Sequence, residues 1–222
     1  MDEHKAVIIG ASGLVGTHLT QLILNDDYFS SVQILVRRKT SLNHPKLREV
    51  IVDFANLKDY ENKFGEGEII FSCIGTTQKN VKGDNILYEK IDHDIPVNAA
   101  SIGFKKGFKQ FILVSSVGAD AKASNFYLRL KGKTENSIKH FAFETIGIFR
   151  PSMLLGDRKE SRPFESLLQG ATKFISAFMF GSLKKYHSIQ AKDVAKAMIA
   201  HSKLKKPGIH VLTYEEIKKL AG

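Results

Sequence analysis

Short runs of consecutive apolar residues alternate along this chain with longer segments whose apolar residues recur every three or four positions. The short runs predict six strands, at Lys5–Ile9, Val32–Val36, Glu49–Val52, Ile69–Cys73, Phe111–Ser115 and Thr145–Arg150. They are continuous rather than alternating, which is typical of strands covered on both faces. The intervening segments predict crossover helices at Leu14–Leu24, Asp94–Lys106 and Tyr127–Phe143. This order predicts an α/β fold with a doubly wound parallel sheet.

After Arg150 the pattern changes. Apolar residues at helical spacing predict a helix within Pro163–Phe180, and then a helix, a strand and a last helix follow at Asp193–His201, Ile209–Leu212 and Tyr214–Leu220. We interpret the 222 residues as one domain, with residues 1–150 as the core and residues 151–222 as a small helical lid on the substrate side. The apolar stripe within Pro163–Phe180 predicts core packing, with a dimer face or a membrane-surface helix as alternatives.

The composition places the chain among ordinary globular proteins. Apolar residues make up 43% and charged residues 25% of the sequence, and no apolar run reaches the roughly 18 residues that a membrane span needs. The polar start, Met1–Lys5, predicts no secretory signal. A single cysteine excludes an internal disulfide and favours a cytoplasmic location. A homodimer contact is expected on the exposed faces of Asp94–Lys106 and Tyr127–Phe143.

The net charge of +10 favours an anionic partner. Nucleic acid, an anionic membrane and a phosphorylated ligand are three such partners. The lysines, however, occur as short scattered groups such as Lys105–Lys106 and Lys184–Lys185, which is typical of a solvated surface. No aromatic-basic interleaving or nucleic-acid recognition motif accompanies the charge, so the sequence gives little support to a nucleic-acid-binding module.

Three glycines stand where the first strand meets the first helix, in the stretch "GASGLVG". Gly10 permits a tight turn, Gly13 leaves the backbone open to a pyrophosphate, and Gly16 lets the helix approach the strand. The first helical amides, at Leu14 and Val15, would then point at phosphate. Since a strand precedes the glycines and a βαβ pattern follows, they predict a dinucleotide site in a Rossmann-type fold.

The end of the second strand indicates which dinucleotide is bound. Arg37 stands where an acidic residue would hold the ribose 2′-hydroxyl of NAD, and Arg38 follows it. Two guanidinium groups suit a 2′-phosphate, and Ser12 could add a hydroxyl donor. We therefore predict NADP as the preferred cofactor and keep NAD as an alternative. If this prediction fails, Arg37 and Arg38 are simply surface residues at a strand end.

Two more segments follow strands at the same edge of the sheet. Asp53–Phe54 comes after the third strand and is expected to contact the adenine. Cys73, Ile74 and Gly75 come after the fourth strand, where a glycine lets backbone meet the adenosine ribose. Cys73 itself is interpreted as a small buried residue rather than a nucleophile.

The chemistry is expected just after the fifth strand. Ser115 and Ser116 end that strand, and Tyr127 and Lys131 share one face at the start of the next helix. A phenol is a poor acid or base at neutral pH, with a pKa of about 10. A neighbouring ammonium and an oxidised nicotinamide would lower that pKa into the working range. Tyr127 could then give a proton to a carbonyl or take one from an alcohol.

With these residues in view, the chain resembles the short-chain dehydrogenase/reductase superfamily in its extended or atypical branch, and within it the small Tat-interacting oxidoreductase-like proteins. The similar stretches are "GASGLVG", "SSVGAD", "NFYLRLKGKTE" and "RPSMLLGDRKESRP". The resemblance implies that Ser116, Tyr127 and Lys131 are catalytic, with Ser115 as the alternative serine. It also implies that Pro151 and Ser152 lie near the nicotinamide.

Two departures from the superfamily pattern stand out. The asparagine that often completes the proton relay is replaced, with Asp92 and Asn98 as nearby candidates. The segment after Arg150 is also shorter than in sugar-nucleotide epimerases. Asp92–His93–Asp94 is interpreted as a carboxylate-rich helix start rather than a metal site, because no second histidine pair stands at ligand spacing.

These observations predict an NADP-dependent oxidoreductase that acts on a small carbonyl or alcohol. An epimerase or dehydratase that keeps its cofactor bound is one alternative. The other is a cofactor-sensing binding protein in which the Tyr127–Lys131 pair is idle.

Overall fold

The structure is a computed structural model that describes residues 3–156 and 186–222. The helix expected within Pro163–Phe180 lies outside the described residues, as does the segment at 157–162 that leads to it. In chain order the described elements are β1 (His4–Ile9), α1 (Leu14–Leu24), β2 (Phe29–Val36), β3 (Leu47–Ile51), α2 (Leu57–Lys63), β4 (Ile69–Ser72), α3 (Asn85–Glu89), η1 (Lys90–Asp94), α4 (Ile95–Lys105), β5 (Gln110–Val114), α5 (Phe126–Lys139), β6 (Thr145–Phe149), β7 (Leu154–Leu155), β8 (Ile189–Gln190), α7 (Ala191–Lys203), β9 (Gly208–Leu212) and α8 (Tyr214–Ala221).

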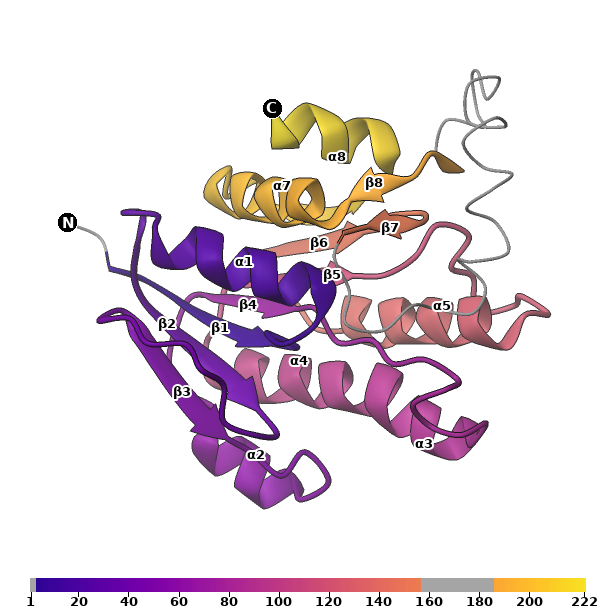
Figure 1. Ribbon diagram of the computed structural model, residues 1–222, viewed down its shortest axis with the longest axis horizontal. Coiled ribbons are helices and arrows are strands. Elements are labelled where there is room, and N and C mark those ends of the chain that lie inside the picture. The colour runs from indigo at the N-terminus through magenta and orange to yellow at the C-terminus, as the bar shows by residue number, and fades with distance from the viewer. Residues whose placement is uncertain (1–2, 157–185) are drawn as a thin grey trace.

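Seven strands form one parallel sheet in the order β3-β2-β1-β4-β5-β6-β9 (Figure 1). The predicted doubly wound sheet is therefore confirmed. The order reverses between β1 and β4, and ligands of such sheets bind at the carboxyl ends of the strands beside this reversal. Every segment that the sequence marked for cofactor or substrate follows the carboxyl end of a strand, so these segments share one edge of the sheet.

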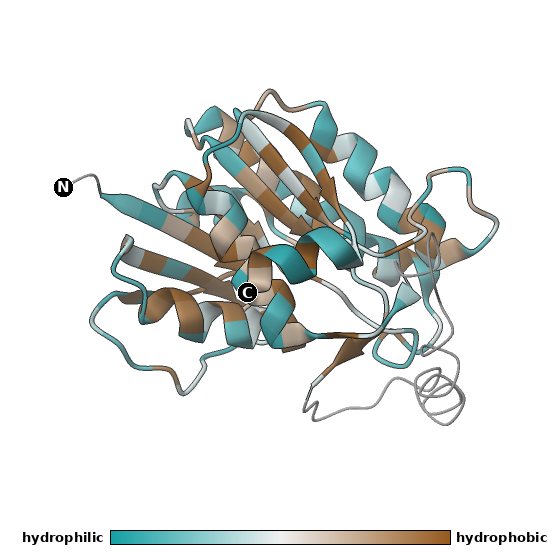
Figure 2. Cartoon of the chain, turned by 90° about the horizontal axis from the view of Figure 1, so that it is seen from above, coloured by the Kyte–Doolittle hydropathy of each residue, from teal (hydrophilic) through white to brown (hydrophobic). Residues whose placement is uncertain are grey.

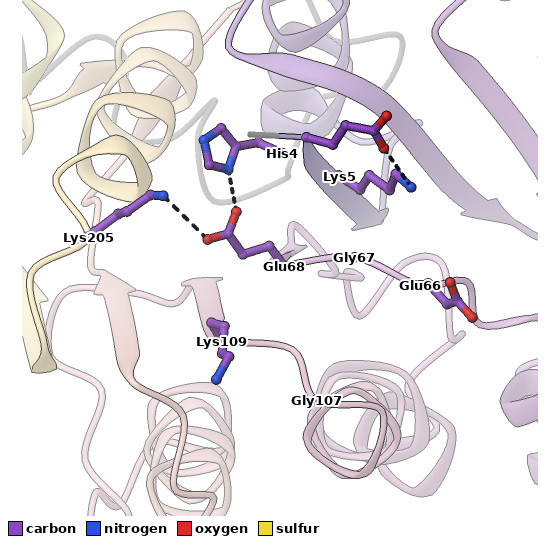
Figure 3. Close-up of a pocket in the computed structure, with 9 residues that line it drawn as sticks. His4, Lys5, Glu66, Gly67, Glu68, Gly107, Lys109 and Lys205 are labelled. Atoms are coloured by element: carbon purple, nitrogen blue, oxygen red, sulfur yellow. Dashed lines mark hydrogen bonds and ion pairs between the residues drawn. The ribbon is translucent and has the colours of Figure 1, made fainter. Parts of the chain in front are cut away.

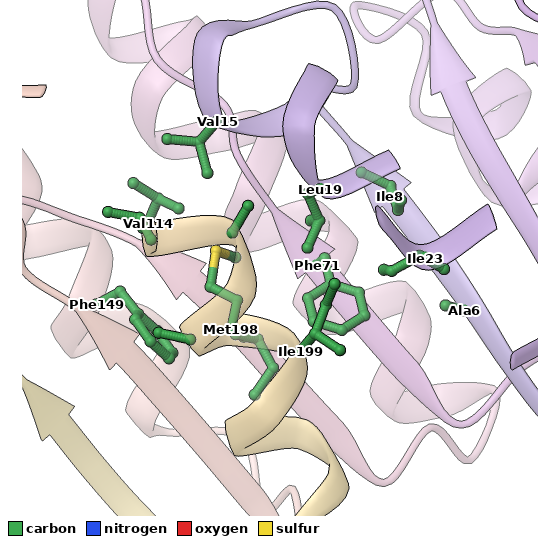
Figure 4. Packing of buried hydrophobic residues seen from close by; sticks show 14 of the residues in the cluster. Ala6, Ile8, Val15, Leu19, Ile23, Phe71, Val114, Phe149, Met198 and Ile199 are labelled. Carbon is green, nitrogen blue, oxygen red and sulfur yellow. The ribbon is translucent and has the colours of Figure 1, made fainter. Parts of the chain in front are cut away.

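Helices cover both faces of the sheet and leave two apolar cores. The first core joins α1, α7 and α8 to the sheet through residues such as Leu19, Phe71 and Met198 (Figure 4). The second lies on the opposite face, where Tyr60 of α2, Ala99 of α4 and Ile138 of α5 pack against the strands. Apolar residues run along the strands and polar ones along the outer sides of the helices (Figure 2). Because helices cover both faces of the sheet, side chains on both sides of a strand are buried. This explains why the strands are continuous apolar runs.

The expected division at residue 150 needs a correction. The strand at Gly208–Leu212 is the seventh strand of the main sheet, paired with β6 from Thr145–Gly208 to Phe149–Leu212. Helix α7 packs against both α1 and α8. Residues 191–221 therefore complete the helical layer and the sheet rather than forming a lid. Strand pairing over such a sequence distance leaves no local signal, so the pattern alone could not show it.

The helix expected at Asp94–Lys106 begins earlier than predicted. A short helix, α3, starts at Asn85 and continues through a π-helical turn, η1, into α4. Asp84 caps α3 by accepting hydrogen bonds from the N–H groups of Ile86 and Leu87 at 2.9 and 3.0 Å. The turn η1 carries Asp92 into the interior of the protein, where 1% of the residue remains exposed.

Candidate functional site

The glycine turn between β1 and α1 has no room for side chains at two of its three glycines. Gly10 has a φ of +80°, and a Cβ there would lie 2.6 Å from the backbone carbon of Cys73. A Cβ on Gly16 would lie 2.0 Å from the carbonyl oxygen of Gly10. The glycines thus bring helix α1 directly onto the end of β1, and they bring this turn into contact with the loop after β4.

The N-terminus of α1 is built to receive an anion. Gly13 is its N-cap, no side chain caps it, and no acidic residue stands in its first turn. The first amides of a helix have no partner within the helix, and the helix dipole favours negative charge there. By contrast, Asn56, Asp84 and Asn125 cap α2, α3 and α5 with their side chains. This uncapped turn fits the diphosphate of a dinucleotide.

The basic residues after β2 face solvent. Arg37 and Arg38 are both exposed, as is Ser12 in the glycine turn. After β3, the Asp53 carboxylate accepts a hydrogen bond from the N–H of Ala55 at 3.0 Å. The Phe54 ring packs edge-on against Tyr60, with ring centroids 4.8 Å apart. Asp53 and Phe54 therefore have local structural partners, and a contact with adenine stays a prediction for both.

The loop after β4 connects the glycine turn to the reacting residues. Burial raises the pKa of the Cys73 thiol to about 12, so this cysteine is not a thiolate at neutral pH. The next residue, Ile74, offers its carbonyl oxygen to the Nζ of Lys131 at 3.5 Å. Gly75 follows at an exposed position. The loop thus touches Gly10 on one side and Lys131 on the other.

Tyr127 and Lys131 lie on the first two turns of α5, at the carboxyl edge of the sheet. The Lys131 Nζ lies 5.9 Å from the centre of the Tyr127 ring. Lys131 is buried, whereas Tyr127 is half-buried. The α5 helix starts here because Asn125 caps it, accepting a hydrogen bond from the N–H of Leu128 at 3.1 Å. The structure thus brings together the tyrosine and lysine that the sequence singled out.

Asp92 is the buried partner of Lys131. Its Oδ2 lies 2.9 Å from the Lys131 Nζ, and its Oδ1 accepts the N–H of Thr76 at 2.7 Å. Asp92 lies in the first turn of η1, as the carboxylate-rich helix start predicted, and η1 turns its side chain into the interior of the protein. Of the two candidates for the missing asparagine, Asp92 is the one that contacts the Tyr127–Lys131 pair through Lys131.

The two serines after β5 have different surroundings. Ser115 is buried, and its hydroxyl donates to Glu135 at 2.5 Å. Arg150 makes two further bonds to the Glu135 carboxylate, at 2.9 and 2.5 Å. Ser116 is half-buried, and its hydroxyl donates to the carbonyl of Val117 at 3.3 Å. The Ser115 hydroxyl is committed to a structural network, which leaves Ser116 as the better candidate for contact with a substrate.

The buried network of Ser115, Glu135 and Arg150 was missed by sequence reasoning. The bonds to Glu135 raise the pKa of the Arg150 guanidinium above its usual range. Glu135 stands four residues after Lys131, as Lys131 stands four after Tyr127. This helical spacing was the available signal, because it places all three side chains on one face of α5.

Pro151 and Ser152 hold the chain that leaves β6. The carbonyl of Pro151 accepts the N–H of Val117 at 2.9 Å, and the Ser152 hydroxyl donates to the carbonyl of His187. The first bond places Pro151 beside the segment that follows Ser116, and the second joins Ser152 to His187.

A family model described as NAD(P)H-binding matches residues 10–203, which include the glycine turn, the Tyr127–Lys131 pair and α7. The chain belongs to this NAD(P)H-binding family. It is 34% identical over 206 residues to Protein HTATIP2 of Rattus norvegicus, covering 90% of this chain and 81% of the rat protein. The family membership rests on this similarity and on the matching model together.

Two further comparisons agree with this assignment. The NAD(P)H-binding chain is 30% identical over 221 residues to "Protein FMP52, mitochondrial" of Meyerozyma guilliermondii, covering 98% of this chain and 95% of the yeast protein. A short-chain dehydrogenase/reductase superfamily protein from Agrobacterium tumefaciens, solved with bound NAD, superposes with a TM-score of 0.71 at 12% identity, covering 95% of this chain and 77% of the other. At that identity the structural likeness concerns the fold alone.

A separate hollow of about 590 Å³ lies at the opposite, amino-terminal edge of the sheet (Figure 3). Several of its charged side chains pair with one another. Glu68 accepts a hydrogen bond from the His4 ring at 2.5 Å and lies 3.6 Å from the Lys205 Nζ, and Lys5 pairs with Glu3 at 2.9 Å. The hollow has neither the glycine turn nor the Tyr127–Lys131 pair of this NAD(P)H-binding protein, so it is not the candidate site.

Across residues 3–156 and 186–222, no helix is both long and apolar enough to cross a membrane. In the same part of the chain no three histidine, cysteine, aspartate or glutamate side chains are grouped as a metal ion would need.

Proposed function

We propose that this chain is an NADP-dependent oxidoreductase that interconverts a small carbonyl compound and its alcohol. One observation carries the proposal. Gly10 of the glycine turn packs against Cys73, and Lys131 of the Tyr127–Lys131 pair reaches Ile74, the next residue. The turn suited to a diphosphate and the pair suited to proton transfer therefore meet on two consecutive residues of one loop.

The residues at this edge fit NADP(H) in distinct roles. The N-terminal amides of α1 would hold the diphosphate, and Arg37 and Arg38 would hold the 2′-phosphate. Lys131 would hold the ribose next to the nicotinamide, with Pro151 and Ser152 nearby. When bound, the cofactor supplies a hydride to the carbonyl carbon.

Tyr127 supplies the proton in this proposal. Its hydroxyl donates a proton to the carbonyl oxygen as the carbon accepts the hydride, so the products are the alcohol and NADP⁺. The resulting phenolate regains a proton from solvent. Ser116 orients the carbonyl oxygen through its hydroxyl, a role supported by the engagement of Ser115 with Glu135. General acid catalysis of this kind contributes about 10²–10⁴-fold to a rate.

Substitution of Tyr127 tests the proposal. Purified protein is incubated with NADPH and a panel of aldehydes and ketones, and the loss of NADPH absorbance is followed. Tyr127→Phe should lower kcat/KM by at least about 10²-fold and leave NADPH affinity unchanged, because only the acidic hydroxyl is lost. Tyr28→Phe is the matched control, since Tyr28 stacks on His4 beside the opposite edge of the sheet. Equal rates for wild type and Tyr127→Phe would contradict the role of Tyr127, and NADPH binding without turnover by either protein would favour a cofactor-sensing binding protein.

The cytoplasmic location stays a proposal that rests on the single cysteine. The yeast relative carries the word "mitochondrial" in its name. Cell fractionation of the native protein distinguishes the two compartments.

A further inference from the structure

We propose that Asp92 is a positioning residue that fixes the Lys131 ammonium and ties it to the loop after β4. The inference rests on the proposed function, because it assigns Lys131 to the site. It extends that function by giving the site a carboxylate that contacts the lysine directly.

The two oxygens of Asp92 serve two different segments. Oδ2 pairs with the Lys131 Nζ at 2.9 Å, and Oδ1 accepts the backbone N–H of Thr76 at 2.7 Å. The Asp92 side chain is fully buried, and the Lys131 side chain is 7% exposed. One buried carboxylate thus joins the helix that carries the reacting residues to the loop that contacts the glycine turn.

The turn η1 holds Asp92 in this place through further bonds to α5. The Thr134 hydroxyl lies 3.2 Å from the Asp92 carbonyl and 2.9 Å from the Leu130 carbonyl, so it is shared between η1 and its own helix. The His93 ring and the Ser137 hydroxyl form a hydrogen bond of 3.2 Å. Together with the ion pair, these contacts connect η1 to α5 at Lys131, Thr134 and Ser137. π-helical turns are rare in proteins, and those that occur are often found at functional sites.

Stability alone does not explain a charged pair at this position. Burying two charges removes both from water, and replacing such a pair by apolar residues of similar volume is often neutral or stabilising. A positioning role does explain it. The Asp92 Oδ2 and the Ile74 carbonyl oxygen both contact the Lys131 Nζ. These two contacts restrict the side-chain rotation of Lys131 and hold its ammonium at the carboxyl edge of the sheet.

The test compares Asp92→Asn with Asp84→Asn. The amide at position 92 still accepts the Thr76 N–H but loses the charge that holds Lys131. Asp84 is a matched control because it caps α3 in the same segment with an exposed carboxylate and bonds to Ile86 and Leu87. Full-length proteins are treated with an N-hydroxysuccinimide ester of acetate, and acetylation of Lys131 is timed by mass spectrometry. Steady-state reduction of the best carbonyl from the panel is measured in parallel.

We expect Lys131 to be acetylated at least about tenfold faster in Asp92→Asn than in wild type or Asp84→Asn. We expect kcat per folded molecule to fall about tenfold to a hundredfold, since small displacements of reacting groups have effects of that size. The KM for NADPH should change less than kcat. Asp92→Glu keeps the charge and should restore part of both properties. Asp92→Ser, which removes the charge and keeps a small polar side chain, replaces Asp92→Asn if the amide variant does not fold.

An unchanged acetylation rate in a folded Asp92 variant that has lost the charge overturns the positioning role and leaves the proposed function standing. A loss of stability with normal kcat per folded molecule overturns it as well. The proposed function fails in a different way, namely if saturating NADPH gives Lys131 of the wild type no protection from acetylation. The acetylation rate of the Asp92 variant therefore tests the positioning role, and NADPH protection of the wild type tests the proposed function.

Discussion

Three side chains on one face of α5 each meet a different part of the molecule. Tyr127 packs against the apolar cluster of Val81, Tyr88 and Leu130, Lys131 pairs with Asp92, and Glu135 binds Arg150 and Ser115. Tyr127 and Lys131 could be predicted because their spacing and their place after a central strand are local features. The partners of Lys131 and Glu135 could not, because they come from segments far away in the chain.

Cofactor preference is decided by single residues after β2. NADPH should bind more tightly than NADH to the wild type, and Arg37→Ala should weaken NADPH binding about 10-fold to 100-fold, since a hydrogen bond to a charged group contributes roughly 1.5–3 kcal/mol. NADH affinity should hardly change. Fluorescence titration measures both affinities. Arg48→Ala is the control, because it removes the same charge from an exposed position on β3. Equal affinity of the wild type for the two cofactors would contradict the role of Arg37.

Among the elements, those with a clear apolar period were predicted and those held by distant partners were not. The six strands of the first 150 residues were confirmed to within a few residues, because both of their faces are covered. Helix α2 was missed because most of its seven residues are polar, with Tyr60 as its buried side chain. The turn η1 was missed because contacts with α5, rather than a local sequence preference, determine its π-helical geometry.

The packing of α7 on the sheet predicts a loss of stability in mild acid. His201 of α7 is buried beside Phe149, and burial, with smaller contributions from His210 and Lys206, lowers its pKa from 6.5 to about 4. The unfolded chain therefore binds a proton that the folded one excludes. Stability should fall as the pH drops from about 6.5 to about 4, by on the order of 2 kcal/mol.

Urea unfolding at several pH values measures this dependence. His201→Phe should flatten the dependence relative to wild type, because the titrating ring is gone while an aromatic side chain remains. The difference between the two curves isolates His201 from other acid-sensitive groups. Parallel curves for the two proteins would contradict the assignment.

Across the whole molecule, the two edges of the sheet have separate roles. The carboxyl edge gathers the glycine turn, the loop after β4 and the start of α5, whereas the amino edge carries the paired charges of His4, Glu68 and Lys205. The sequence predicted the first arrangement because parallel strands end on one side. It could not predict that β9 extends the main sheet, since β9 finds its neighbour β6 only after the chain has folded back.

A chain that stops after Gln190 should therefore not fold. It lacks α7, β9 and α8, and it would expose the apolar face of the sheet that Val194, Met198 and Ile217 cover. We expect no cooperative thermal transition by circular dichroism, with partial recovery when residues 187–222 are supplied as a separate fragment. A truncated protein that melts cooperatively and binds NADPH would show that this segment is dispensable.

The face of α5 that carries Tyr127, Lys131 and Glu135 has a consequence for how this protein can diverge. A substitution there affects one partner at a time. Inserting or deleting one residue between Tyr127 and Glu135 would turn everything downstream by about 100° around the helix axis. Glu135 would then lose its contacts with Arg150 and with Ser115 at the same time. An insertion or deletion just before Lys131 would also separate Lys131 from Asp92. During evolution, substitutions between Tyr127 and Glu135 should therefore be tolerated far more often than insertions or deletions.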